Sequence, residues 1–297
     1  MMKSYLLLHI AILLAACSGI FGYLISLDAV LITWYRMLFS AMMLLAVVML
    51  RKRLTIVRSD WKILATGFLL ALHWTMFYAS IKFANVSVGT VCFSLSGFFT
   101  AIIAPLLNRK RISWTELMLS GLTLAGISLI FHFDTSFRTG ILFGVLSALL
   151  FAFYAVLNGR ISQSDNVMKT TALQMTGGAV GLGALLPLYL HLQPSAVMLP
   201  EPADLLYLLL LAFGCTVCMC TFLNMAQKRI SAFTVSLSFN LEPVYSIALA
   251  IILFREDRML GTSFYAGLSL ILLSLLLQML HVAARRKKDG SSRECRA

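Results

Sequence analysis

Two ionisable side chains, Glu242 and His73, interrupt long apolar stretches of this sequence near their middle. A charge in the hydrocarbon core of a membrane is costly unless it is paired or hydrated, so each of these residues is a functional candidate. Glu242 could carry a proton or bind a ligand, and His73 could exchange a proton or meet a substrate carboxylate. The structural alternative stays open for both residues: a neutral Glu242 that stabilises a kink at Pro243, and a His73 that donates a buried hydrogen bond.

Hydroxyl, amide and aromatic side chains accompany these two residues. Ser94 and Ser96 lie in one apolar stretch, and Asn240 precedes Glu242 in another. Such residues can line a polar cavity, and they can equally serve helix packing or interface anchoring. Proton coupling is assigned to Glu242 and His73. The full set of candidate substrate-binding residues is His73, Trp74, Tyr78, Ser94, Ser96, Tyr154, Asn224, Asn240 and Glu242.

Arg36 lies early in the second apolar stretch, about 9 Å from its outer end at a rise of 1.5 Å per residue. A long basic side chain at this depth can reach the lipid headgroups. We therefore expect Arg36 to be an anchor, with Asp28 nearby. Substrate contact is the alternative.

The composition requires these residues to be positioned by membrane-spanning helices. The chain of 297 residues is 60% hydrophobic and 12% charged, with a mean hydropathy of +0.90, whereas soluble domains carry roughly 25% charged residues. Apolar stretches of about 20 residues recur along the whole chain. The predicted spans are Tyr5–Leu24, Val30–Leu50, Trp61–Ile81, Val86–Leu107, Trp114–Phe131, Gly140–Asn158, Thr170–Leu190, Asp204–Ala226, Phe233–Phe254 and Leu260–Val282. The predicted fold is an all-α integral membrane protein with ten transmembrane helices.

The basic residues indicate the orientation of these helices. Most of the 24 lysines and arginines fall on one side of the predicted topology, in the loop 51–62, the loop 108–113 and the tail 285–297. Positive loops face the cytoplasm, so both termini are expected there, with the protein in the cytoplasmic (inner) membrane. The basic cytoplasmic loops and tail then account for the net charge of +12, and a nucleic-acid partner is not needed to explain it. The tail is expected to face lipid headgroups.

The chain contains an internal duplication. With an offset of 146 positions, the stretch from Trp74 to Ile102 falls on the stretch from Cys220 to Ala248, and Gly121 falls on Gly267. An odd number of spans in each half inverts the second copy, which is the architecture of many secondary transporters. We expect a first five-helix repeat over 1–136, a second over 137–284, and a basic tail over 285–297.

No metal site or cofactor is predicted. The six cysteines lie in predicted spans or in the tail, and no ATP-binding motif occurs. The sequence Leu14-Ala15-Ala16-Cys17 has the form of a lipoprotein cleavage box, but cleavage there would remove one span and break the match between the halves. We expect Cys17 to be a residue of the first span.

The sequence resembles the drug/metabolite transporter superfamily, EamA type. The resemblance is carried by "TWYRMLFSAMML" from Thr33, "FYASIKFANVSVGTVCFSLSGFFTAII" from Phe77 and "SFNLEPVYSIALAIILFRED" from Ser238. It implies a ten-span carrier of amino acids, other metabolites or toxic compounds. One departure is that the acidic residue after the fourth span of each half is present as Glu256 but replaced by Lys110, which we expect to affect loop packing more than transport.

These observations predict a secondary transporter, not an enzyme. It would move small metabolites, with amino acids or related compounds and export implied by the family, by alternating access and with a proton as a candidate coupling ion. The alternative is an intramembrane enzyme with Glu242 and His73 as acid and base. Against it, the sequence lacks H-E-x-x-H and G-x-S-x-G motifs, and inverted copies around a polar centre suit transport.

Overall fold

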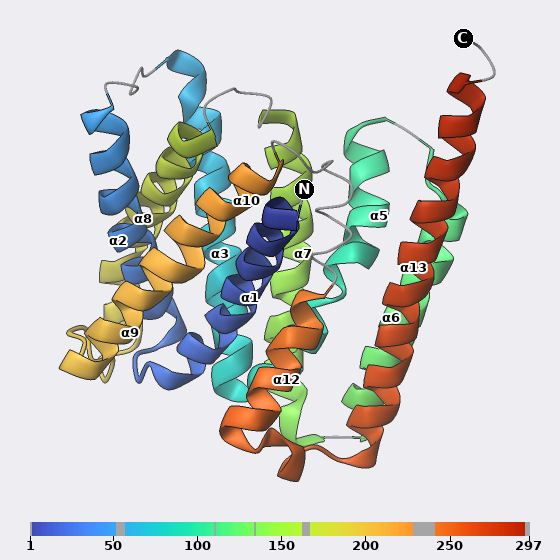
Figure 1. The fold of residues 1–297 in the computed structure, drawn as a ribbon. Coiled ribbons are helices and arrows are strands. Elements are labelled where there is room, and N and C mark those ends of the chain that lie inside the picture. Colours follow the sequence, from blue (N-terminus) through green and yellow to red (C-terminus); the bar gives the residue numbers. More distant parts are fainter. Residues whose placement is uncertain are drawn as a thin grey trace.

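The structure is a computed structural model that describes residues 2–51, 57–109, 111–133, 135–161, 167–227 and 241–294 (Figure 1). Every regular element in this part of the chain is helical. The helices of the first half are α1 Met2–Leu24, α2 Ala29–Leu50, α3 Trp61–Phe83, α4 Val86–Phe93, α5 Ser96–Leu107 and α6 Trp114–Phe133. Those of the second half are α7 Arg138–Ile161, α8 Val167–Leu192, α9 Pro202–Ala212, a π-helix Phe213–Cys218, α10 Met219–Gln227, α12 Glu242–Phe254 and α13 Thr262–Glu294. Short 3-10 turns occupy Arg58–Asp60, Thr135–Phe137 and Glu256–Arg258.

Among the described residues, seven helical segments are long and apolar enough to cross a membrane. They are Lys3–Leu24, Ala29–Leu50, Trp61–Phe83, Val86–Leu107, Arg138–Gly159, Val167–Leu192 and Pro202–Phe222. Shorter apolar helices, Leu117–Ile130, Glu242–Phe254 and Thr262–Leu277, fall within the three remaining predicted spans. The first part of the predicted span Phe233–Phe254 lies outside the described residues. An all-helical membrane protein is therefore confirmed.

Polar contacts mark the two ends of the helix bundle. Between the α1–α2 connection and the start of α9, the hydroxyl and amide of Ser26 both donate to Asp204, at 2.5 and 2.8 Å. The hydroxyl of Tyr189 donates to Asp28 at the same end, over 3.0 Å. At the opposite end, Lys169 pairs with Asp60 over 2.9 Å. Each of these contacts joins the first half of the chain to the second.

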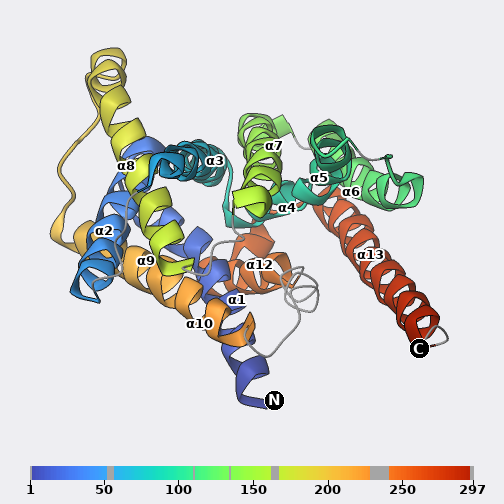
Figure 2. The ribbon, with the colours of Figure 1, turned by 90° about the horizontal axis from the view of Figure 1, so that it is seen from above.

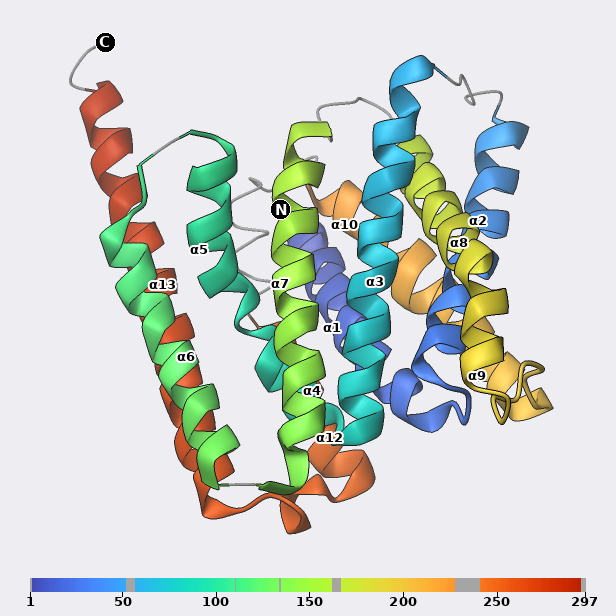
Figure 3. The same cartoon turned by 180° about the vertical axis from the view of Figure 1, so that it is seen from behind.

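Packing between the halves follows a regular scheme. Helix α3 packs against α7 and α8, while α1 packs against α10 and α12. Helix α2 packs against α8, α4 against α12, and α6 against α13. Figure 2 shows the pair α6 and α13 at one side of the molecule, away from α2 and α8, and Figure 3 shows α3 and α7 side by side from behind. Glycines allow the closest approaches: a Cβ at Gly67 would lie 2.0 Å from the carbonyl oxygen of Gln174.

The α6–α13 contact is reciprocal. A Cβ at Gly126 would lie 2.6 Å from the carbonyl oxygen of Gly267, and a Cβ at Gly267 would lie 2.6 Å from that of Gly126. These glycines begin the similar pentapeptides GISLI and GLSLI. Gly121, which the fixed offset aligns with Gly267, has nothing within 4 Å of its Cβ position. The contact partner of Gly267 is thus Gly126.

Glu256 is a structural residue at the end of α12. Its two carboxylate oxygens accept from the backbone N–H groups of Val86 and Ser87, both at 2.9 Å. These are the first residues of α4, so the carboxylate binds the orphan donors at that N-terminus, where negative charge is favoured. The acidic residue after α12 therefore holds the start of α4.

Candidate functional site

The polar centre of the described bundle forms around Arg36 on α2, whose side chain is buried, with 2% of its surface exposed. Its Nη1 donates to the hydroxyls of Tyr78 and Ser18, at 2.6 and 2.8 Å. Its Nε donates to the hydroxyl of Thr216 at 3.1 Å, and its Nη2 donates to the carbonyl oxygen of Cys215 at 3.2 Å. The guanidinium therefore joins α1, α2 and α3 of the first half to the π-helix of the second.

The π-helix explains why the second half can offer these acceptors. A π-turn inserts a residue into an α-helix and disturbs the i to i−4 ladder, and such turns occur often at functional sites. The hydroxyl of Thr216 donates to the carbonyl oxygen of Leu211, five residues earlier, at 3.4 Å. The adjacent carbonyl of Cys215 accepts from Arg36. The irregular turn thus supplies both a hydroxyl and a backbone oxygen to the guanidinium.

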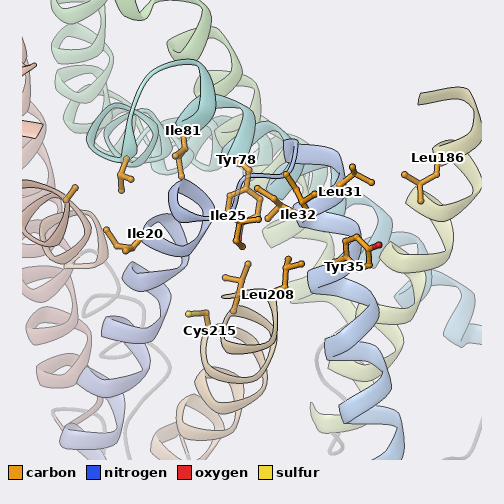
Figure 4. Close-up of a cluster of buried hydrophobic side chains, with 14 residues drawn as sticks. Ile20, Ile25, Leu31, Ile32, Tyr35, Tyr78, Ile81, Leu186, Leu208 and Cys215 are labelled. Atoms are coloured by element: carbon orange, nitrogen blue, oxygen red, sulfur yellow. The ribbon is translucent and has the colours of Figure 1, made fainter. Parts of the chain in front are cut away.

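Two aromatic residues of α3 hold the guanidinium from the other side. Its central carbon lies 3.6 Å from the ring centroid of Trp74, which is a close cation–π contact. Tyr78 is fully buried, at the centre of the apolar cluster in Figure 4. Gly22 of α1 gives the Tyr78 ring its space, because a Cβ there would lie 2.3 Å from the ring. Trp74 and Tyr78 were predicted cavity residues, and the structure brings them together at Arg36.

The expectation that Arg36 anchors the protein to lipid headgroups was wrong. The side chain points into the bundle, and Asp28 bonds to Tyr189 instead of Arg36. A signal was present in the sequence: Thr33, Arg36 and Ser40 are three or four residues apart and share one face of a helix. All three are buried.

His73 occupies a separate, mostly aromatic environment. Its Nδ1 lies 2.9 Å from both the carbonyl oxygen and the hydroxyl of Ser147 on α7. A carbonyl oxygen can only accept, so this contact favours the tautomer with the proton on Nδ1. The ring centroids of Phe151 and Phe93 lie 5.0 and 5.3 Å away. These contacts favour a packing role for His73 between α3, α4 and α7.

Two helices begin at equivalent places within the fourth span of each half. The fourth span of the first half is broken at Ser94 and Leu95, and α5 starts at Ser96. Helix α12 starts at Glu242, 146 positions later, with a half-buried side chain. A carboxylate at a helix N-terminus is stabilised by the helix dipole. Glu242 and Arg36 are not within ion-pair distance of each other.

The other predicted site residues are distributed around this centre. Ser94 is buried at the break with its hydroxyl unpartnered within the described part of the chain, and Ser96 is half-buried. The hydroxyl of Tyr154 donates to Gln174, which in turn donates to Asn158. Asn224 lies on α10, but its side chain is outside the described part. Asn240 lies wholly outside it.

No group of three or more His, Cys, Asp or Glu side chains that could hold a metal ion occurs among the residues the structure describes. Cys215 and Cys218 lie on the π-helix, where the Cys215 carbonyl serves Arg36. The residues around the guanidinium are hydroxyls, a carbonyl and an indole. This chemistry suits an organic anion better than a metal cation, because the central group is itself positive.

Comparison with known proteins identifies the class of this fold and site. The EamA-like transporter family matches residues 2–132 and again residues 138–280. The chain therefore belongs to the EamA-like transporter family, within the drug/metabolite transporters. It is a multi-pass membrane protein.

Two individual proteins are similar to it. One is described as an uncharacterized transporter from Haemophilus influenzae, 24% identical over 165 residues, which are 52% of this chain and 54% of that protein. The match thus spans about half the length of this relative. The other is a crystal structure described only as that of a protein, with 16% identity, a TM-score of 0.62, and coverage of 95% of this chain and 98% of that one. This likeness supports the fold over nearly the whole chain.

Proposed function

We propose that the chain is a secondary carrier that exports small metabolites, amino acids or related compounds, across the cytoplasmic membrane by alternating access. Its ten spans would form two inverted repeats, over 1–136 and 137–284, with both termini and the tail 285–297 in the cytoplasm. The proposal extends the family's transport function to a substrate class, a direction and a mechanism.

One observation carries the proposal: when the two halves are exchanged, each pair of helices that packs between them maps onto a pair that also packs. In this exchange, α1 corresponds to α7, α2 to α8, α3 to α9 together with α10, α4 and α5 to α12, and α6 to α13. The α3–α7 contact then corresponds to the α10–α1 contact, which is present. The α3–α8 contact corresponds to the α9–α2 contact, which is also present. The pairs α2–α8, α4–α12 and α6–α13 map onto themselves. Such symmetry suits two repeats that rock about a shared centre.

The polar residues at that centre come from both halves. Arg36, Trp74 and Tyr78 belong to the first half, while Thr216 and the Cys215 carbonyl belong to the second. Rocking of one half against the other would therefore change the surroundings of the guanidinium directly. The helix starts at Ser96 and Glu242 are 146 positions apart, at matching places of the two proposed repeats. Membrane transporters tolerate interrupted helices where they line a cavity.

The enzyme alternative is not favoured. An acid and base need a common reacting atom between them. His73 instead bonds to Ser147 among phenylalanine rings, and Glu242 begins α12. Glu242 remains our candidate for proton coupling. His73 is the second candidate for proton coupling, although its contacts with Ser147 and the phenylalanine rings favour a packing role.

The test replaces Glu242 by Gln and measures uptake of labelled amino acids and metabolites into proteoliposomes, with and without a pH gradient. We expect Glu242→Gln to reduce transport or uncouple it from the gradient while the protein still assembles. Glu201→Gln, an exposed carboxylate before α9, is the matched control. Unchanged uptake by Glu242→Gln across a range of pH would refute the role of this carboxylate.

A further inference from the structure

The guanidinium of Arg36 is a buried charge without a paired carboxylate. Within the described part of the chain, the one ion pair joins Lys169 and Asp60 at the end of the bundle. Each contact of Arg36 is neutral: three hydroxyls, one carbonyl oxygen and one indole ring. An uncompensated charge in such a site is costly. A counter-charge brought by a ligand would therefore be bound strongly.

Acidic side chains at the helix ends of the described bundle are committed to other partners. Asp28 accepts from Tyr189, Asp204 accepts from Ser26, and Glu256 holds the start of α4. Glu242, at the start of α12, likewise makes no ion pair with Arg36. The described part of the chain thus supplies no paired carboxylate for the guanidinium.

The donors around Arg36 can be turned toward an anion. A guanidinium carries five N–H donors, and four of them are used, which leaves one on Nη2. The hydroxyls of Ser18 and Tyr78 lie 3.1 Å from each other. Each hydroxyl is an acceptor for Arg36 and can rotate to donate to a carboxylate oxygen. The Trp74 ring stacks on one face of the guanidinium. The N–H donors lie in the guanidinium plane, so this stacking does not block them.

We infer that Arg36 binds the carboxylate of the transported metabolite, with the hydroxyls of Ser18 and Tyr78 as further donors. The inference rests on the proposed carrier function and narrows its substrates to compounds that carry a carboxylate. Carboxylates match the planar fork of arginine with two parallel hydrogen bonds. When the π-helix moves with the second half, Thr216 and the Cys215 carbonyl release Nε and Nη2, and this edge becomes free for the substrate.

The experiment uses two series of probes that differ in their charged groups. The aromatic series is L-phenylalanine, 3-phenylpropionate and 2-phenylethylamine, and the aliphatic series is L-leucine, 4-methylpentanoate and isopentylamine. Thermal stabilisation of the full-length protein in detergent reports binding, and uptake into proteoliposomes reports transport. We expect the amino acid and the acid of at least one series to bind, and the amine of that series to bind at least tenfold more weakly.

Substitutions at Arg36 assign this preference to the site. Arg36→Gln should weaken carboxylate binding by at least tenfold, while the exposed Arg58→Gln should leave it unchanged. Arg36→Lys keeps the charge but lacks the fork, so it should bind carboxylates more weakly than the wild type and more tightly than Arg36→Gln. This second variant tests the inference even if Arg36→Gln does not assemble.

The outcomes separate the inference from the carrier function. Transport of the amines without the acids, or equal carboxylate binding by the wild type and both Arg36 variants, would overturn the carboxylate site and leave a carrier. Binding of carboxylates that depends on Arg36, with no uptake of any probe, would leave the site and overturn the carrier function. Failure of every carboxylate in both series to bind would overturn the inference.

Discussion

The ion pair between Asp60 and Lys169 should stabilise the packing of α3 against α8 where both helices begin. The atoms lie 2.9 Å apart, and the side chains are only 7% and 11% exposed. Two unit charges at this distance attract by about 6 kcal/mol at an effective dielectric constant of roughly 20. Desolvation offsets much of this, and hydrogen bonds between charged groups contribute about 1.5–3 kcal/mol net. We therefore expect a coupling energy of about 2 kcal/mol, or roughly thirtyfold in an equilibrium constant.

A double-mutant cycle measures this coupling. Asp60→Asn, Lys169→Gln and the double variant are compared by thermal unfolding of the purified protein. Each single variant should lose stability, and the double variant should lose clearly less than the sum of the two. Strict additivity of the three changes would refute the pairing.

The same pair predicts a dependence on pH. Although burial raises the pKa of Asp60, the hydrogen bonds from Lys169 and from the Val57 amide hold it below its ordinary value of 3.8. A carboxyl group whose pKa is lowered by folding contributes stability that is complete above the unfolded pKa and is lost as the pH falls toward the folded one. Below about pH 4, the wild type should lose stability more steeply than Asp60→Asn. Identical acid profiles would contradict this assignment.

Two further substitutions test packing and capping, each with a matched control. Gly67→Ala should destabilise the protein by about 1–3 kcal/mol, because the new Cβ would lie 2.0 Å from the backbone oxygen of Gln174; Gly121→Ala, which has open space, should be neutral or slightly stabilising in the same thermal assay. Glu256→Gln should destabilise the protein by about 0.5–2 kcal/mol, because a neutral amide offers one acceptor oxygen where the carboxylate offers two. Asp257→Asn changes an exposed neighbour and should alter the stability little. Equal effects of Glu256→Gln and Asp257→Asn would argue against the cap.

The fold could be predicted from the sequence because helix boundaries in a membrane follow simple patterns. Apolar stretches of about 20 residues between polar turns have few alternatives in lipid. The offset of 146 positions also anticipated that Ser96 and Glu242 are equivalent, and both begin a helix. The offset did not extend to the last span. In the last span, Gly267 contacts Gly126 and not Gly121. The loops of the two copies differ in length, so one constant offset cannot align every span.

The centre of the site could not be found from depth alone. Arg36 was placed by its distance from the end of its helix, and that distance is compatible with both an anchor and a buried ligand-binding residue. Its partners are Ser18 and Tyr78 of the same half, and Thr216, which lies 180 residues further along the chain. The local sequence gives no sign of the π-turn that presents Thr216. Only the three-dimensional packing of both halves shows that these groups meet.

The central claim is that the two halves rock around the Arg36 site. Double electron–electron resonance in liposomes can follow one pair of labels at Leu24 and Glu201 at one end, and another at Arg51 and Val167 at the other; all four residues are exposed. On addition of a carboxylate that stabilises the protein, the two distances should change in opposite directions. If both distances stay constant, or if both grow or shrink together, the halves do not alternate and the account is contradicted.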